Sequence, residues 1–261
     1  MTNPASPVAS AHQPPDLMRR TAFLGGALYV LTFLSSIPAA ALTGPVLHPR
    51  YVLGPGVDQQ IALAGVLDVV NILAAVGTAV VLYPVVKRQN ATLALGFVAT
   101  RLLEGSLLFT AVLTTLSVTT LRQQSDALAG TGTGTDPEAL VATAAALIAV
   151  HDWAFLLGTG TAVANALMLA PLMYRSGLVP RVIPLLGLIG APMLLTANLL
   201  TVLGLNEQMS VLSTLALPGI FFWELSLGVY LMVKGFRPSP ILTSAMPHPG
   251  AHRAEPVAVT R

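Results

Sequence analysis

The sequence contains no cysteine and very few charged residues. The lack of cysteine excludes disulfides, thiolate catalysis and cysteine-ligated zinc or iron–sulfur sites, and it leaves the redox compartment undetermined. Charged residues make up 9% of the 261 residues, against roughly 25% in an ordinary soluble domain. Hydrophobic residues make up 54% and the mean hydropathy is +0.75. A soluble fold of this composition would have too little polar surface to cover its core.

A strong net charge is also missing, because the formal net charge is only +2. The basic residues lie mostly at the ends of apolar runs, where they act as topology signals and form no basic surface for binding nucleic acid. The apolar runs contain no pair of histidines at i, i+4 spacing and no Glu-x-x-His motif, so neither a metal nor another cofactor is expected. The expected partners are the lipid bilayer and a proton or small solute.

Long apolar runs are the main feature that is present, and each is long enough to cross a membrane as a helix. We expect six spans, at about 21–42, 61–86, 91–121, 137–174, 182–203 and 211–233. The prediction is an all-α polytopic membrane protein with one six-helix domain, 18–236, between disordered tails, 1–17 and 237–261. A cleaved signal peptide is the alternative for the first span, but its apolar run exceeds the roughly 7–15 residues of a signal segment.

The fourth apolar segment has a clear start and an unusual length. Asp136-Pro137-Glu138 combines a capping side chain, a proline at the first helical position and an acid at the positive end of the helix dipole. The helical pattern then continues to Tyr174, which is too long for a span of about 20 residues. We therefore expect a kink or break near His151-Asp152, or a short lid-like helix before the span.

Lysine and arginine are distributed unevenly between the two sides of the predicted bundle. With both termini on the inner side, the outer side carries only Arg50 and Arg122. The inner side carries all other basic residues outside the spans: Arg19, Arg20, Lys87, Arg88, Arg175, Arg181, Lys234, Arg237, Arg253 and Arg261. This asymmetry predicts that both termini are cytoplasmic.

Ionisable residues inside the expected spans are the main candidates for function, because a charge at mid-bilayer costs at least ~2.5–3.5 kcal/mol. Arg101 and Glu104 share a helical face, and Asp68 and Asn71 repeat their spacing on the second span. Counting residues from the inner ends puts Asp68, Glu104 and Glu224 near a common depth. One arginine cannot neutralise three carboxylates, which predicts a proton relay or cation site. The alternative is a polar core that only orders the bundle.

His151 and Asp152 form a second candidate group, nearer the outer surface. A histidine beside a carboxylate suits acid–base chemistry. A Ser-His-Asp triad would also need a nucleophile, for which Ser106 and Ser117 are the available serines. His151 and Asp152 are the weaker candidates for catalysis, and a gate at the outer end of a kinked fourth helix is the other role that they suit.

Several short motifs resemble a known family. They are Ala27–Phe33, the Asp and Asn of the second span, Tyr83-Pro84, Arg101-x-x-Glu104, His151–Gly158, Tyr174–Arg181, Phe222–Leu225 and Lys234–Phe236. Together they are similar to the bacterial integral-membrane proteins grouped as domain-of-unknown-function family 4386, over about 18–236. The resemblance implies a multi-span bundle in the bacterial plasma (inner) membrane. It implies no activity, so no catalytic role carries over.

Three functions are compatible with these patterns. The first is a plasma-membrane protein that moves or senses a proton, ion or small solute through the buried carboxylates and Arg101. The second is a membrane-embedded enzyme that acts on a lipid-like substrate with His151 and Asp152, and it predicts a groove beside His151. The third is a structural or partner-binding bundle without chemistry, in which the polar residues fix the helix register.

Overall fold

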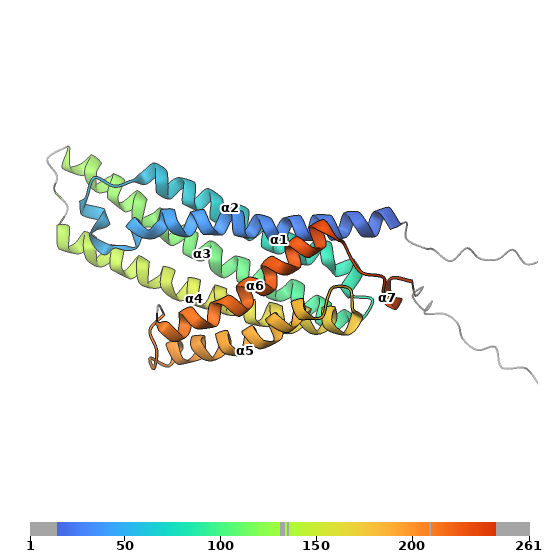
Figure 1. Cartoon of the computed structure of the whole chain (residues 1–261). Coiled ribbons are helices and arrows are strands. Elements are labelled where there is room, and N and C mark those ends of the chain that lie inside the picture. The colour runs from blue at the N-terminus through green and yellow to red at the C-terminus, as the bar shows by residue number, and fades with distance from the viewer. Residues whose placement is uncertain (1–14, 131–133, 135, 209, 244–261) are drawn as a thin grey trace, which may run out of the picture.

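The computed structural model describes residues 15–130, 134, 136–208 and 210–243, and this part of the chain is helical without a strand. Six helices are long and apolar enough to cross a membrane, which confirms the predicted all-α fold (Figure 1). They are α1 (Pro15–Thr43), α2 (Asp58–Val86), α3 (Ala91–Ala129), α4 (Pro137–Ser176), α5 (Val182–Val202) and α6 (Val211–Val233). Three short helices complete the chain: η1 (Gly44–Leu47), η2 (Pro49–Leu53) and α7 (Pro240–Thr243).

The six long helices form a closed ring. Each packs against its neighbours in sequence, and α6 returns to pack against α1. The start of α1 and the end of α6 therefore lie at the same end of the bundle, where Arg19 donates a hydrogen bond of 2.9 Å to the carbonyl of Val233 (Figure 1). Opposite helices, such as α3 and α6, are separated by the centre of the ring.

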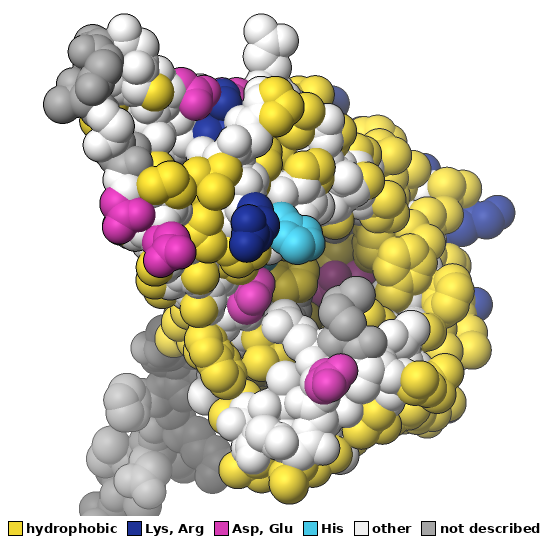
Figure 2. All heavy atoms as spheres, turned by 90° about the vertical axis from the view of Figure 1, so that its left-hand side faces the viewer, with side chains coloured by type: hydrophobic (Ala, Val, Ile, Leu, Met, Phe, Trp, Pro, Cys, Tyr) yellow, Lys and Arg dark blue, Asp and Glu magenta, His cyan; other side chains and the backbone are white. Residues whose placement is uncertain are grey.

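The two ends of the ring differ in charge. The basic end, at which α1 begins and α2 ends, carries Arg19, Arg20, Lys87, Arg88, Arg175, Arg181, Lys234 and Arg237. The acidic end carries Asp58, Asp126, Asp136, Glu138 and Glu207 together with Arg50 and Arg122. Figure 2 views the acidic end and shows a hollow between its charged upper part and its lower rim, with an acidic side chain visible inside.

Glycines allow the closest helix contacts in the ring. A Cβ atom at Gly190 of α5 would lie 2.6 Å from the backbone carbon of Gly219 in α6. A Cβ atom at Gly228 of α6 would likewise lie 2.7 Å from the Cβ of Tyr29 in α1. Small residues at such crossings let helix backbones approach closely, which is how helices associate where the surrounding lipid is as apolar as the helices.

The apolar interior is divided into two cores. The larger contains residues of all six long helices, and the buried ring of Trp223 packs in it against Gly187. The smaller lies at the acidic end, where Val46 and Val52 of the η helices pack with Leu140 and Ile148 of α4. The extra length of α3 and α4 beyond α5 and α6 forms this second core.

The structure corrects the expectation for the fourth helix. The predicted start is confirmed, since the Asp136 side chain accepts a hydrogen bond of 3.0 Å from the backbone N–H of Glu138. However, α4 runs as one α-helix from Pro137 to Ser176, so the predicted break or separate lid helix near His151 is wrong, and the kink near His151 stays a prediction. The reason is the acidic-end core, which buries Leu140, Ala144 and Ile148 along one face of α4 and so stabilises the start of the helix as a direct extension of the span.

The ordered domain extends further than predicted at both ends. Residues 15–17 already belong to α1, while 1–14 lie outside the described residues. At the other end, the backbone N–H of Arg237 donates to the carbonyl of Leu178, and the Ser239 hydroxyl donates to the carbonyl of Ser176. These bonds hold the chain against the end of α4 as far as α7, and 244–261 lie outside the described residues.

Candidate functional site

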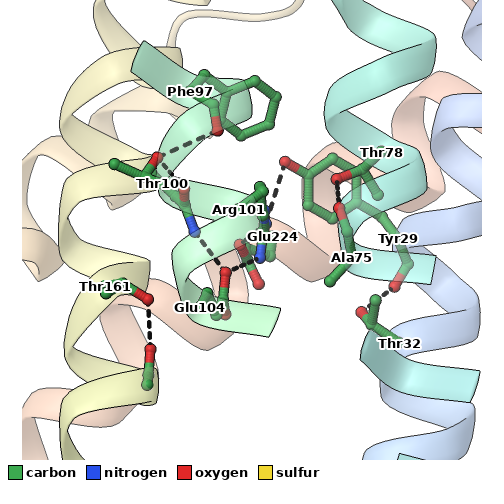
Figure 3. A network of polar contacts seen from close by, with 12 residues as sticks. Tyr29, Thr32, Ala75, Thr78, Phe97, Thr100, Arg101, Glu104, Thr161 and Glu224 are labelled. Carbon is green, nitrogen blue, oxygen red and sulfur yellow. Dashed lines mark hydrogen bonds and ion pairs between the residues drawn. The ribbon is translucent and has the colours of Figure 1, made fainter. Parts of the chain in front are cut away.

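A buried ionic group joins α3 to α6 across the centre of the ring. Arg101 is 2% exposed and donates through Nη1 to Glu104, one turn further along α3, at 2.9 Å. Its Nη2 atom donates to the carboxylate of Glu224 on α6 (Figure 3). Since α3 and α6 are opposite helices, the Arg101–Glu224 pair crosses the ring interior. We refer to Arg101, Glu104 and Glu224 as the central triad.

Two further helices, α1 and α4, contact Arg101 and Glu104, and α2 lies beside Tyr29 of α1 (Figure 3). The guanidinium of Arg101 lies over the ring of Tyr29 from α1, at 5.5 Å from the ring centroid, and contacts its hydroxyl at 3.4 Å. The side-chain amide of Asn165 on α4 donates to Glu104, and Thr100 donates to the oxygen of that amide. On α2, the buried hydroxyl of Thr78 donates to the carbonyl of Ala75.

The two carboxylates of the central triad are held differently. Glu104 accepts hydrogen bonds from Arg101 and from Asn165, and its side chain is 10% exposed. Glu224 accepts from Arg101 alone among the described residues, and its side chain is 15% exposed. Glu224 is therefore the less constrained of the two acids.

The central triad has one positive group for two carboxylates. Burying a charge costs free energy unless it is paired and hydrogen-bonded. A single guanidinium compensates one carboxylate fully, so two ionised acids leave one excess negative charge in the interior. In addition, within the described chain, the buried Nε of Arg101 has no hydrogen-bond partner. Buried donors normally have one, so polar groups of a ligand or of water suit this interior.

Asp68 and Asn71 lie on α2, away from the central triad. A Cβ atom at Gly105 of α3 would touch both Ile72 and Val76 of α2, so Gly105 lies level with the turn between them, and Asp68 lies about 10 Å, or two helical turns, nearer the acidic end than Glu104. Neither Asp68 nor Asn71 forms a hydrogen bond or ion pair with any described residue. The common depth expected from residue counting does not hold for Asp68, because α2 and α3 pack with an offset that the count ignores.

Although partly exposed, Asp68 and Asn71 lie on the inward face of α2. Asp68 follows Ala64 and precedes Ile72 at the four-residue spacing of one helical face, and both of these apolar neighbours are buried. Asn71 is followed at the same spacing by the buried Ala75. Partly exposed polar groups within a buried stripe indicate that they face internal space between helices.

His151 and Asp152 are neighbours on α4 and are in contact. The Nδ1 atom of His151 lies 3.1 Å from a carboxylate oxygen of Asp152. The histidine is buried and stacks on Phe155, with ring centroids 5.9 Å apart, whereas the Asp152 side chain is 52% exposed.

Neither candidate serine completes a catalytic triad. The hydroxyl of Ser106 donates to the carbonyl of Leu102, and that of Ser117 donates to the carbonyl of Leu113. Both hydroxyls therefore bond within α3. Among the described residues, no group of three or more histidine, aspartate or glutamate side chains gathers as metal ligands would.

A second charged group, which sequence reasoning missed, lies at the acidic end. Arg122 of α3 donates through Nε and Nη2 to the two carboxylate oxygens of Asp58, and through Nη1 to Asp126 at 2.6 Å. The hydroxyl of Tyr51 in η2 donates to Asp58 at 2.7 Å, and the Gly54 carbonyl accepts from Arg122 at 3.2 Å. Burial, together with the Asp58 carboxylate, raises the pKa of Tyr51 above its usual value. We call these residues the Arg122 cluster.

Tyr29, Thr100 and Asn165 were not predicted as parts of the central site. The side-chain amide of Asn165 bonds across helices, from α4 to Glu104 on α3. Tyr29 carried no comparable signal, since one buried aromatic residue on α1 resembles any other until the packing with α3 is known. For the Arg122 cluster, the spacing of Arg122 and Asp126 by four residues was the available sequence signal.

The matched segment of a family model covers all of these sites. The model described as "Domain of unknown function (DUF4386)" matches residues 24–235. The chain belongs to this family. The match confirms the resemblance drawn from the short motifs, and the six apolar helices give this DUF4386 chain its membrane character. No curated protein and no solved structure matches the chain.

Proposed function

We propose that this DUF4386 protein moves or senses a proton through its central triad, with Glu224 as the exchanging group and Arg101 as the fixed counter-ion. The observation that carries the proposal is the arrangement of two carboxylates around one buried guanidinium at the centre of a closed ring. In this setting one bound proton removes the excess negative charge, and no second basic side chain is needed.

Glu104 has more hydrogen-bond partners than Glu224, and this difference assigns their roles. Binding of a proton to a Glu224 oxygen forms an O–H bond and neutralises that carboxylate. Arg101 then remains paired with Glu104, which Asn165 also holds in place. The link between α3 and α6 weakens as a result. Proton binding is thereby coupled to the contact between opposite helices, which is what a transporter or a sensor requires.

Two features support access to the central triad from the acidic end. The hollow at that end is seen in Figure 2, and it contains an acidic side chain. Asp68 and Asn71 are partly exposed on the inward face of α2, between the acidic end and the level of Glu104. In the proposal these groups form the entry path, and Asp68 accepts a proton before it reaches Glu224.

The proposed location is the bacterial plasma membrane, with both termini cytoplasmic. The bacterial assignment rests on the resemblance described above, and the orientation rests on the charge difference between the basic and acidic ends. In this orientation the hollow opens to the outside. The proposed proton path therefore leads from the outer surface to mid-membrane.

The test is proton flux into liposomes that contain the purified protein and a pH-sensitive dye. After an acid step outside, the wild type should acidify the lumen faster than protein-free liposomes do. Glu224→Gln should remove most of this difference in acidification rate, and Asp68→Asn should remove part of it. The control variant Glu207→Gln, which replaces an exposed acid, should have no effect. Unchanged proton flux in folded Glu224→Gln protein would contradict the proposal and favour a bundle without chemistry.

Acid–base catalysis at His151 has less support from the contacts. The histidine is buried and stacked on Phe155, and the serines considered as nucleophiles bond within their own helix. A protein that relied on His151 would lose function in His151→Gln but keep it in Glu224→Gln. The two variants therefore separate the two candidate functions.

A further inference from the structure

A pocket at the basic end lies on the surface of α1, outside the ring interior. Its volume is about 350 Å³, and it is lined by Arg19, Arg20, Phe23 and Leu24. We call it the α1 pocket. It is far from the central triad, since Arg101 lies about 15 Å along α3 from the basic end.

The lining combines two cations with an apolar floor. Phe23 and Leu24 follow Arg20 by three and four residues, so all three occupy one face of α1 within about one turn. The side chains of Phe23 and Leu24 are 48% and 52% exposed. Further along the same face, Leu31 and Leu34 are also exposed. The face therefore carries positive charge at the end of the helix and an apolar track that leads toward mid-membrane.

Contacts with α6 fix the position of Arg19. Its Nη2 atom donates to the carbonyls of Val233 and Met232, at the end of α6. Gly235 has a positive φ of 76°, and a Cβ atom there would lie 2.8 Å from Nη1 of Arg19. Arg19 is thus held in place by the end of a neighbouring helix.

Arg20 has no such partner. It is exposed and forms no hydrogen bond or ion pair with the described residues, including Asp16 one turn earlier on α1. No acidic side chain lines the pocket. The pocket therefore presents one fixed and one unpaired guanidinium above an apolar surface.

We propose that the α1 pocket binds an anionic phospholipid, with its phosphate on Arg19 and Arg20 and an acyl chain along Phe23, Leu24 and Leu31. Guanidinium groups bind phosphate oxygens in a bidentate geometry, and basic pockets at the cytoplasmic side of membrane helices suit anionic headgroups. A free phosphate ion would use the arginines alone, so the apolar floor points to a lipid as the source of the phosphate.

Lipid binding to the full-length protein in neutral detergent tests the proposal. Phosphatidylglycerol is titrated while the melting temperature is recorded, with phosphatidylcholine as the neutral lipid. The wild type should gain stability with phosphatidylglycerol at concentrations at which phosphatidylcholine has no effect. Arg20→Ala should weaken this response about fivefold, the effect of one basic residue near an anionic headgroup. Arg20→Lys should keep most of it.

Arg20 is chosen because, unlike Arg19, it caps no helix, so its loss should not disturb folding. Arg175→Ala is the matched control, since Arg175 is an exposed basic residue at the same end and lies outside the α1 pocket. If Arg20→Ala and Arg175→Ala lost the stabilisation by phosphatidylglycerol equally, the lipid would be attracted by the basic end in general, and the assignment of the α1 pocket as its site would be overturned. An equal response to inorganic phosphate or glycerol phosphate would overturn the lipid assignment. Full phosphatidylglycerol affinity in Arg20→Ala would also overturn the proposal.

Discussion

At the scale of single residues, Arg101 is the side chain on which the interior depends most. It is the counter-ion for two carboxylates from opposite helices and also packs on the ring of Tyr29. Removing one member of a buried ion pair leaves an uncompensated charge, whereas surface pairs contribute little. The structural role of Arg101 is therefore expected whether or not the proposed function is correct.

Arg101→Ala should lower the free energy of unfolding in detergent by about 3–5 kcal/mol, because it leaves Glu104 and Glu224 buried without a cation. Arg101→Lys should recover part of this loss, since a single ammonium cannot form the fork that contacts both acids. Denaturation midpoints measure both effects. The exposed Arg175→Ala variant is the control, with a change within about 0.5 kcal/mol. Equal stability of Arg101→Ala and Arg175→Ala would contradict the assignment of Arg101 as buried counter-ion.

Tyr51 should make stability depend on alkaline pH. Its pKa in the folded protein is raised by burial and by Asp58, so the folded state holds the phenolic proton more tightly than the unfolded state. The resulting stabilisation is complete below the ordinary tyrosine pKa of about 10 and is lost as pH rises through the higher folded value. Thermal melts from neutral to alkaline pH measure this loss. Tyr51→Phe should be less stable than the wild type at neutral pH and should lose less stability as the pH rises. If the melting temperature of Tyr51→Phe fell with pH as steeply as that of the wild type, the result would argue against the hydrogen bond to Asp58.

At the scale of elements, the Arg122 cluster ties the segment 44–57 to α2 and α3. Arg122 contacts Asp58 at the start of α2 and the carbonyl of Gly54 in the preceding loop. Gly56, with a φ of +54°, lies against the same guanidinium, where a side chain would collide with it. The η helices, held in this way, cover the acidic-end core beside α4.

Arg122→Ala should therefore loosen this segment while leaving the rest of the ring intact. Loss of its charged hydrogen bonds costs about 1.5–3 kcal/mol, so amide exchange in 44–57 should accelerate about tenfold or more. Hydrogen exchange read by mass spectrometry resolves the effect by segment, with α5 and α6 as the internal reference. Arg50→Ala is the matched variant, because Arg50 lies in the same segment without a contact to Asp58. Uniform acceleration over the whole chain would show that the cluster stabilises the entire fold and not one segment.

Sequence reasoning was most reliable for features that repeat along one helix. Apolar runs predicted six spans, and the i, i+3 spacing predicted the Arg101–Glu104 pair. Contacts between helices were harder to predict, because they depend on how far one helix is shifted along its axis relative to the next. Counting residues along the sequence does not give this shift. Asp68 was expected near the depth of Glu104 but lies about two turns nearer the acidic end, and the contact of Tyr29 with Arg101 was not predicted. The acidic-end core was also missed, since apolar residues that face protein and those that face lipid look alike in sequence.

At the scale of the whole molecule, the opposite charges of the two ends predict the orientation in the membrane. The absence of native cysteine makes this testable with single introduced cysteines, because unmodified protein gives no background. Glu138→Cys places a thiol at the acidic end and Lys234→Cys places one at the basic end, both at exposed positions. A membrane-impermeant maleimide should label Glu138→Cys in intact bacterial cells and Lys234→Cys only after permeabilisation, because basic loops remain cytoplasmic. The reverse pattern would place the hollow of Figure 2 on the cytoplasmic side and the α1 pocket in the outer leaflet. The proposed proton path would then lead inward from the cytoplasm, and the choice of anionic lipid for the α1 pocket would lose its electrostatic basis.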